Sequence, residues 1–119
     1  MYKIKIILAG LFICFATNLV AQETYIIKGD TLNLQREVKG PLSLFWVKEG
    51  LGYRYFVQKG KRMIELRNAD NSQIFKEQLE EITADVKIKA QDVKFVLYSL
   101  KHFINRYNAM VQEDYEYNE

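Results

Sequence analysis

Between residues 24 and 67, hydrophobic and polar side chains alternate with a period of two, and short glycine-bearing segments interrupt the alternation. This pattern predicts half-buried β-strands, because successive side chains of a strand point to opposite faces. The predicted strands cover residues 25–27, 32–34, 42–48, 53–58 and 63–67. Because the connections are short, consecutive strands pair in antiparallel fashion. The region therefore predicts an antiparallel β-meander over residues 24–67.

The hydrophobic period changes after a polar break at residues 68–72. Phe75, Leu79 and Ile82 recur at i, i+4 and i+7, and charged side chains occupy the other side. Apolar residues at this spacing form one stripe of an α-helix. The break contains residue types that favour helix N-caps. We predict an amphipathic helix over residues 72–83.

Residues 86–111 fit two patterns. A single long helix would align seven apolar residues on one stripe, namely Val93, Val96, Leu97, Leu100, Ile104, Tyr107 and Val111. Alternatively, Val93, Phe95 and Leu97 alternate as a strand, and Ser99 begins a helix. Since β-branched and aromatic residues favour strands, we prefer a short strand over 93–97 followed by a helix over 99–110. In either case the apolar side of the helix packs against the sheet.

These elements predict one domain of the α+β class, a curled antiparallel sheet with helices on one face. The chain has 119 residues, which suffices for one hydrophobic core. We assign the domain to residues 22–119. Its last segment, residues 112–119, is acidic and is predicted to be frayed.

The first 21 residues have the pattern of a secretory signal peptide. Lys3 and Lys5 precede an apolar run over residues 6–16, and Ala21 offers a small residue at the cleavage position. The apolar run is shorter than the roughly 20 residues that a membrane helix needs. An uncleaved N-terminal anchor is the alternative. Cleavage after Ala21 predicts an exported protein that meets the membrane only through the signal peptide.

Cys14 is the single cysteine of the chain and lies within this signal segment. Ile13 precedes it, whereas a lipoprotein signal has a small residue there, so we do not expect lipidation. The mature chain is then free of cysteine. Small exported eukaryotic domains usually depend on disulfides. The composition therefore favours a bacterial protein of the periplasm, the cell surface or the secreted fraction.

The charge of the chain is unevenly distributed. The net charge of +2 comes from 17 Lys and Arg against 15 Asp and Glu, and the signal peptide carries both excess cations. Residues 28–67 hold nine basic and four acidic residues, whereas residues 70–119 hold six basic and ten acidic ones. The mature chain is therefore neutral with a basic first half and an acidic second half. This balance and the predicted export argue against nucleic acid as a ligand.

Candidate catalytic and metal-binding residues are few. His102 is the only histidine, and no second acid or base supports it by spacing. Zinc sites rely largely on N and S ligands from His and Cys, of which the mature chain offers one imidazole and no thiolate. We predict no catalytic residue, no metal and no cofactor, and we expect the protein not to be an enzyme.

One strand offers candidate ligand-binding residues. Tyr53 and Tyr55 alternate with Arg54, and Arg62 and Arg67 follow on the neighbouring segment. A sheet surface that mixes aromatic and cationic side chains can bind anionic polymers or glycans by stacking and charge. The leading functional prediction is a non-enzymatic module that binds another envelope or secreted protein. A binder of anionic polysaccharide is the alternative.

Overall fold

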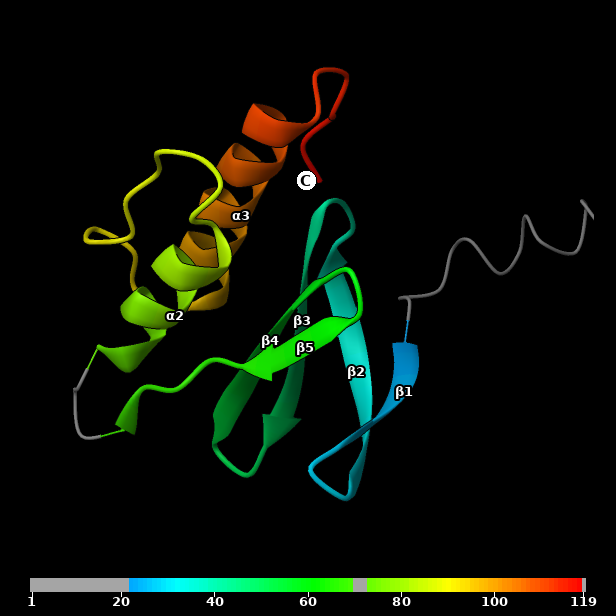
Figure 1. The fold of residues 1–119 in the computed structure, drawn as a ribbon. Coiled ribbons are helices and arrows are strands. Elements are labelled where there is room, and N and C mark those ends of the chain that lie inside the picture. The colour runs from blue at the N-terminus through cyan, green and yellow to red at the C-terminus, as the bar shows by residue number, and fades with distance from the viewer. Residues whose placement is uncertain (1–21, 70–72, 119) are drawn as a thin grey trace, which may run out of the picture.

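The computed structural model describes residues 22–69 and 73–118, in which five strands precede two helices (Figure 1). The strands are β1 (Gln22–Ile27), β2 (Asp30–Val38), β3 (Leu42–Glu49), β4 (Gly52–Lys59) and β5 (Arg62–Glu65), and the helices are α2 (Ile74–Ile82) and α3 (Leu97–Val111). The predicted signal peptide and Ser72, the predicted start of the first helix, lie outside the described residues. The α+β class is confirmed.

The five strands form one antiparallel sheet in the order β1-β2-β3-β4-β5, which confirms the predicted meander. Two-residue turns join three of the strand pairs. In the first turn Lys28 and Gly29 have φ angles of 53° and 87°. Two consecutive positive φ values are typical of a type I′ turn, whose twist matches that of the flanking strands. The turn lies in the interval between the first two predicted strands, and β2 begins earlier than predicted, at Asp30.

A β-bulge in β2 changes which face its side chains occupy. The register with β3 shifts between Arg36 and Val38, so that Glu37 is the additional residue. Leu34 lies on one face of the sheet and Val38 on the other. Because a bulge increases the local twist, it also helps the sheet to curl.

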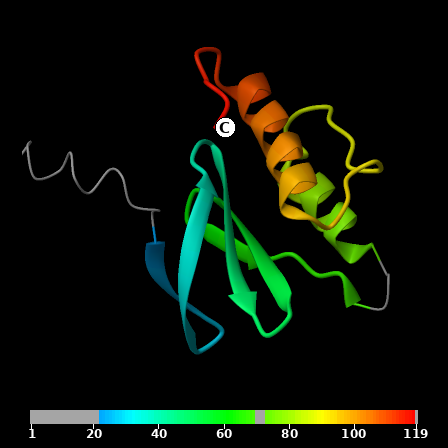
Figure 2. The ribbon, with the colours of Figure 1, turned by 180° about the vertical axis from the view of Figure 1, so that it is seen from behind.

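The face of the sheet that meets the helices holds the larger core (Figures 1 and 2). Side chains of β2, β3, β4 and both helices are completely buried there, among them Val38, Leu42, Leu44, Val57, Leu79, Leu100 and Ile104. The predicted amphipathic stripe of the first helix, Phe75, Leu79 and Ile82, is buried in this core. The prediction that the helices cover one face is confirmed.

The opposite face lies inside the curl of the sheet and holds a second, smaller core. Only Leu34, Phe45 and Phe56 are buried there, and five partly buried side chains surround them, namely Tyr25, Ile27, Leu32, Val47 and Met63. Within the described residues no helix covers this face. Its apolar side chains are protected mainly by the curvature of the sheet.

The prediction of a strand over residues 93–97 is wrong. Val93 and Val96 donate their N–H groups to the nearby carbonyls of Ala90 and Lys94, and α3 already begins at Leu97. Phe95 packs edge-on against Tyr55 with ring centroids 5.0 Å apart. Val93 and Phe95 therefore pack into the helix-side core without joining a sheet ladder, whereas Val96 is 49% exposed. The single long helix over 86–111 is not formed either.

Candidate functional site

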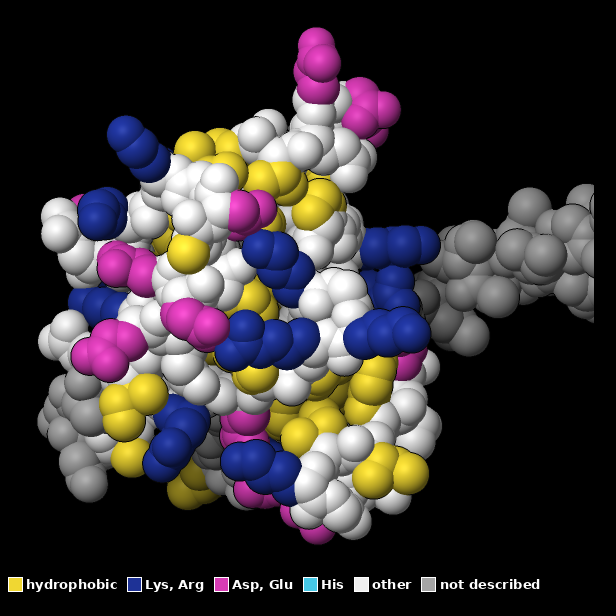
Figure 3. All heavy atoms as spheres, viewed as in Figure 1, with side chains coloured by type: hydrophobic (Ala, Val, Ile, Leu, Met, Phe, Trp, Pro, Cys, Tyr) yellow, Lys and Arg dark blue, Asp and Glu magenta, His cyan; other side chains and the backbone are white. Residues whose placement is uncertain are grey.

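The sheet curls between its two edge strands, β1 and β5 (Figure 1). Residues of both strands line one groove. Its volume is about 490 Å³. Ile26, Ile27 and Lys28 contribute from the end of β1 and its turn, and Met63, Ile64 and Glu65 contribute from β5. Figure 3 shows hydrophobic side chains between Lys and Arg side chains on the face that β5 crosses. We call this feature the edge groove.

A second hollow of about 400 Å³ adjoins the edge groove where β5 ends. Lys28, Glu65 and Arg67 line both spaces. Tyr53 and Phe95 add aromatic surface to the hollow. The two spaces together combine apolar side chains, such as those of Ile27 and Met63, with charged side chains around them.

The backbone of β1 turns polar groups toward its open side. Ile27 and Asp30 are the residue pair next to the two-residue turn, which is a hydrogen-bonded pair in hairpins of this type. Since hydrogen-bonded and non-hydrogen-bonded pairs alternate, Thr24 and Ile26 direct their N–H and C=O groups away from β2. Within residues 22–69 and 73–118, no strand pairs with this side of β1.

The backbone of β5 is open over part of its length. Leu66 donates its N–H to the carbonyl of Tyr55 at 2.8 Å, just beyond the end of β5. The same alternation turns the N–H and C=O groups of Met63 and Glu65 away from β4. The carbonyl of Glu65 accepts a hydrogen bond from Nε2 of Gln78 at 2.9 Å, so the open positions of this edge lie at Met63 and at the N–H of Glu65. Both edges therefore offer free ladder positions beside the edge groove, and free ladder positions are templates for strand addition.

The carboxylate of Glu65 is neutralised within the protein. Nε and Nη2 of Arg54 each donate a hydrogen bond of 2.9 Å to it, and Nη1 of Arg54 donates to Glu49 at 3.1 Å. Glu65 raises the pKa of Arg54 above its usual value through these bonds. The guanidinium also lies over the ring of Phe56, 5.3 Å from its centroid. Arg54 therefore covers part of the smaller core.

Three further cations surround the edge groove. Lys28, Lys61 and Arg67 are exposed, and none of them forms an ion pair with another residue in the described ranges. Their charges are therefore not offset in the way that the charge of Arg54 is. Among the described residues, the lining of the groove therefore carries an excess of positive charge, which favours anionic ligands.

The structure brings together three of the five ligand-binding residues that the sequence predicts. Tyr53, Arg54 and Arg67 line the hollow beside the edge groove. Tyr53 is 49% exposed and packs edge-on against Trp46, with centroids 5.6 Å apart. Tyr53 and Arg54 belong to opposite faces of β4 and meet the hollow from different sides of the strand.

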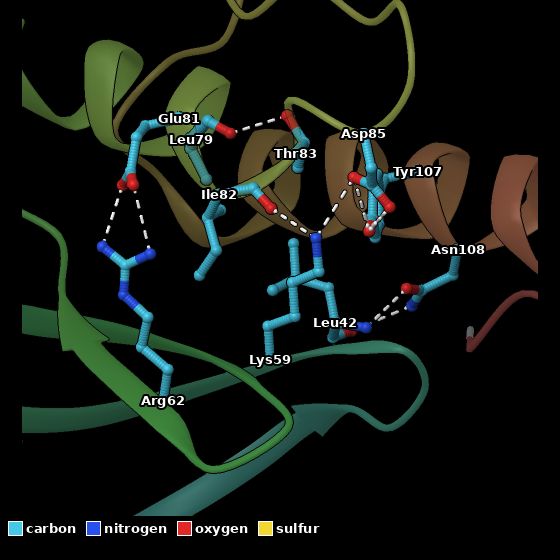
Figure 4. Close-up of polar contacts among 10 residues, drawn as sticks. All are labelled: Leu42, Lys59, Arg62, Leu79, Glu81, Ile82, Thr83, Asp85, Tyr107 and Asn108. Atoms are coloured by element: carbon cyan, nitrogen blue, oxygen red, sulfur yellow. Dashed lines mark hydrogen bonds and ion pairs between the residues drawn. The ribbon is translucent and has the colours of Figure 1, made fainter.

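The other two predicted residues lie elsewhere. Tyr55 is only 5% exposed and belongs to the helix-side core, and burial raises its pKa. Arg62 points toward α2, where Nη1 and Nη2 donate to the carboxylate of Glu81 at 3.1 and 2.9 Å (Figure 4). The five residues do not form one surface. Sequence reasoning missed Lys28, because no local pattern indicates that the β1–β2 turn lies beside β5.

A polar cluster joins the end of β4 to the helices (Figure 4). Nζ of Lys59 donates to the carbonyl of Ile82 at 3.0 Å and to Asp85 at 3.1 Å, and the hydroxyl of Tyr107 donates to Asp85 at 2.9 Å. Burial raises the pKa of Tyr107, and its contact with Lys59 raises the pKa of that amine. Desolvation opposes ionisation of Asp85, but the hydrogen bonds from Tyr107 and Lys59 lower its pKa.

A smaller hollow of about 310 Å³ lies between α3 and the C-terminal segment. Tyr98, His102 and Tyr117 line it. The segment, predicted to be frayed, makes hydrogen bonds to the buried side chain of Asn105, whose Oδ1 accepts from the hydroxyl of Tyr115 at 2.5 Å. His102 is exposed at the rim and makes no hydrogen bond to another side chain in the described ranges.

In comparisons with known proteins, no family model, curated protein or solved structure matches this chain. Within the described residues, no helix is long and apolar enough to span a membrane. The same residues contain no group of three or more His, Cys, Asp or Glu side chains arranged to hold a metal ion. We take the edge groove as the candidate site because two strand edges with open backbone positions line it together with apolar and cationic side chains.

Proposed function

We propose that this protein is a non-enzymatic binding module that receives an extended segment of another protein in the edge groove. The observation that carries the proposal is the position of the two open sheet edges, which line one groove together with apolar and charged side chains. An extended segment that adds to a sheet edge gains main-chain hydrogen bonds, and neighbouring pockets select its side chains. The partner would extend the sheet beside β1 or β5.

The residue types around the groove support a binding role. Ile27 and Met63 offer partly buried apolar surface, and Lys28, Lys61 and Arg67 surround it with charge. The polar groups of the Lys59 cluster, in contrast, bond to one another and join the sheet to the helices. These contacts favour a structural use of that cluster over a catalytic one.

The proposal includes the predicted destination of the protein. The basic start and apolar run within residues 1–21 indicate export. The partner is then another envelope or secreted protein. A cysteine-free mature chain suits this setting, because it has no thiol to oxidise outside the cytoplasm.

Binding of an anionic polysaccharide is the second candidate. The observation that favours it is the hollow beside the groove, where Tyr53 and Phe95 accompany Lys28, Arg54 and Arg67. Aromatic rings and cations can hold an anionic sugar chain. We place it second because Arg54 is already paired with Glu65 and because free backbone edges recognise peptides.

The experiment compares the substitutions Ile26→Pro and Ile26→Val in a pull-down from an extract of the source cells. Proline removes the outward N–H of residue 26 and is tolerated at such an edge position, whereas valine keeps the N–H. We expect Ile26→Val to retain the partner protein and Ile26→Pro to lose it. Hydrogen exchange on the complex should show new protection at the amides of Ile26 or Met63.

Two results would contradict the proposal. If a bound protein is retained equally by both variants and protects neither amide, it uses another surface. If only glycan is recovered, whichever residue occupies position 26, the polysaccharide candidate replaces the peptide one. A salt series separates the two further, because binding to a polyanion weakens steeply as ionic strength rises.

A further inference from the structure

The side chains on the inner side of β5 follow a regular charge pattern. Lys61, Met63, Glu65 and Arg67 occupy alternate positions along the chain, and all four line the edge groove. Lys61 lies in the turn before β5, and Arg67 follows its end. At about 3.4 Å per residue, the six steps between the two cations span roughly 20 Å of extended chain.

The middle of this row carries no net charge. Met63 is apolar and partly buried beside Phe45 and Phe56. The charge of Glu65 is offset by the two hydrogen bonds from Arg54. The row therefore has positive ends and a neutral, partly apolar centre.

The end at Arg67 is the more positive of the two. Lys28 lines both the edge groove and the adjoining hollow, and it shares both spaces with Arg67 and Glu65. Lys61 lines only the groove. One end of the row therefore combines two cations, whereas the other end has one.

From this arrangement we infer that the partner segment is an extended acidic peptide whose carboxylates stand about six residues apart on one face, with an apolar side chain between them. The segment lies along β5 with one carboxylate beside Lys61 and the other beside Arg67 and Lys28. Residues i, i+2, i+4 and i+6 of an extended chain share a face, so the apolar residue at i+2 or i+4 faces Met63. This inference rests on the proposed function and specifies the chemistry of its partner.

The test is a selection from a library of random ten-residue peptides displayed on phage, with the protein purified from cells that express the full chain. We expect enrichment of peptides with Asp or Glu at i and i+6 and an apolar residue between them. Synthetic peptides from the selection are then compared with versions that carry Lys at both ends. Lys at both ends replaces two attractions with two repulsions. Each exposed ion pair contributes modestly, but the two reversals together should weaken binding about tenfold or more at low salt.

Variants of the protein locate the effect. Lys61→Glu should weaken binding of the acidic peptide and improve binding of a peptide whose Lys61-facing end carries Lys. Lys89→Glu is the matched control, because Lys89 is also exposed but lies in the connection between α2 and α3, outside the groove. The difference between Lys61→Glu and Lys89→Glu should shrink at about 1 M salt, where charges are screened beyond roughly 3 Å.

The outcomes separate this inference from the proposed function. The selected peptides could lack acidic residues and still lose their binding to the Ile26→Pro or Met63→Pro protein. This result would overturn the inferred charge pattern of the partner and would leave the proposal of an extended segment standing. If selected peptides respond to none of the groove substitutions, or if nothing is enriched, both proposals are wrong. Ile26→Val and Met63→Leu, which keep the backbone N–H, control for changes in folding.

Discussion

The two faces of the sheet are stabilised in different ways. On one face α2 and α3 cover a large apolar core, and polar side chains such as Lys59 and Asn108 join sheet and helices (Figure 4). On the other face a small core depends on the curl of the sheet and on the side chains of Arg36 and Arg54, which lie over aromatic rings. The first face is closed by packing, whereas the second remains accessible at its edges.

This difference explains why the edge groove is the better candidate for binding. A closed core tolerates few changes, because it is packed to high density. A partly covered core between two free edges can bury more apolar surface only by receiving another chain. Stability and proposed function are thus assigned to opposite faces of one sheet.

The largest predicted effect contrasts two leucines, one on each face. Leu44 is completely buried in the helix-side core, whereas Leu32 is partly buried beside the smaller one. Leu44→Ala should lower the free energy of unfolding by about 2–5 kcal/mol, the usual range for a buried leucine. Leu32→Ala should lower it by about 1 kcal/mol, since less apolar area is lost from contact. Urea denaturation of both variants measures the difference.

Equal losses in the two variants would contradict the comparison. They would mean that the face inside the curl is packed as closely as the helix-covered face. The edge groove would then have little capacity to accept a ligand without rearrangement of the sheet.

A smaller effect contrasts two asparagines. Asn108 is completely buried on α3, where its Oδ1 accepts from the N–H of Leu42 at 2.8 Å and its Nδ2 donates to the carbonyl of Leu42 at 2.9 Å. Asn108→Ala leaves both backbone groups without a partner and should cost about 1–3 kcal/mol in the free energy of unfolding. Asn33 is exposed on β2 and accepts only from the hydroxyl of Thr24.

The matched substitution Asn33→Ala should change the free energy of unfolding by no more than about 0.5 kcal/mol. Urea denaturation of the two alanine variants tests the pair. If Asn108→Ala is as mild as Asn33→Ala, the buried amide does not join helix and strand in the way its hydrogen bonds indicate.

The elements of the fold were largely predictable from the sequence, because they depend on local periodicity. The alternation along β3 and β4 and the stripe from Phe75 to Ile82 both reflect which side chains a single element buries. The segment at Val93 misled the prediction, since its alternation reflects packing against Tyr55 and the helices. Periodicity records burial and does not reveal whether a backbone finds a sheet partner.

The candidate site was less predictable for a different reason. Tyr53, Arg54 and Arg67 could be named because they cluster along the chain. Lys28 lies far from them in sequence and reaches the same space only through the curl of the sheet, to which the bulge at Glu37 contributes. The pairing of Arg62 with Glu81 likewise depends on where α2 lies. Contacts between distant segments were the part that local patterns could not supply.

The smallest predicted effect is a dependence of stability on pH on the helix-covered side. The hydrogen bonds from Tyr107 and Lys59 lower the pKa of Asp85 in the folded protein, despite partial desolvation. A group with a lowered folded pKa stabilises the protein above its unfolded value, which is about 3.9 for Asp, and loses that contribution as the pH falls through the folded value. Asp85→Asn should therefore reduce stability at pH 6 and bring it close to the wild type near pH 2.

The control for this prediction is Asp92→Asn, in the same connection between the helices, where the side chain makes no ion pair or side-chain hydrogen bond within the described residues. Its difference from the wild type should stay nearly constant over the same pH range. Because Asp85 is about half exposed, with 48% of its side chain accessible, the effect is modest and should decrease in salt. A constant difference for Asp85→Asn from pH 6 to pH 2 would show that its carboxylate is not stabilised by Lys59 and Tyr107. The polar connection between sheet and helices would then rest on its other contacts, among them the bonds of Asn108 to Leu42 and the ion pairs Arg62–Glu81 and Lys101–Glu37.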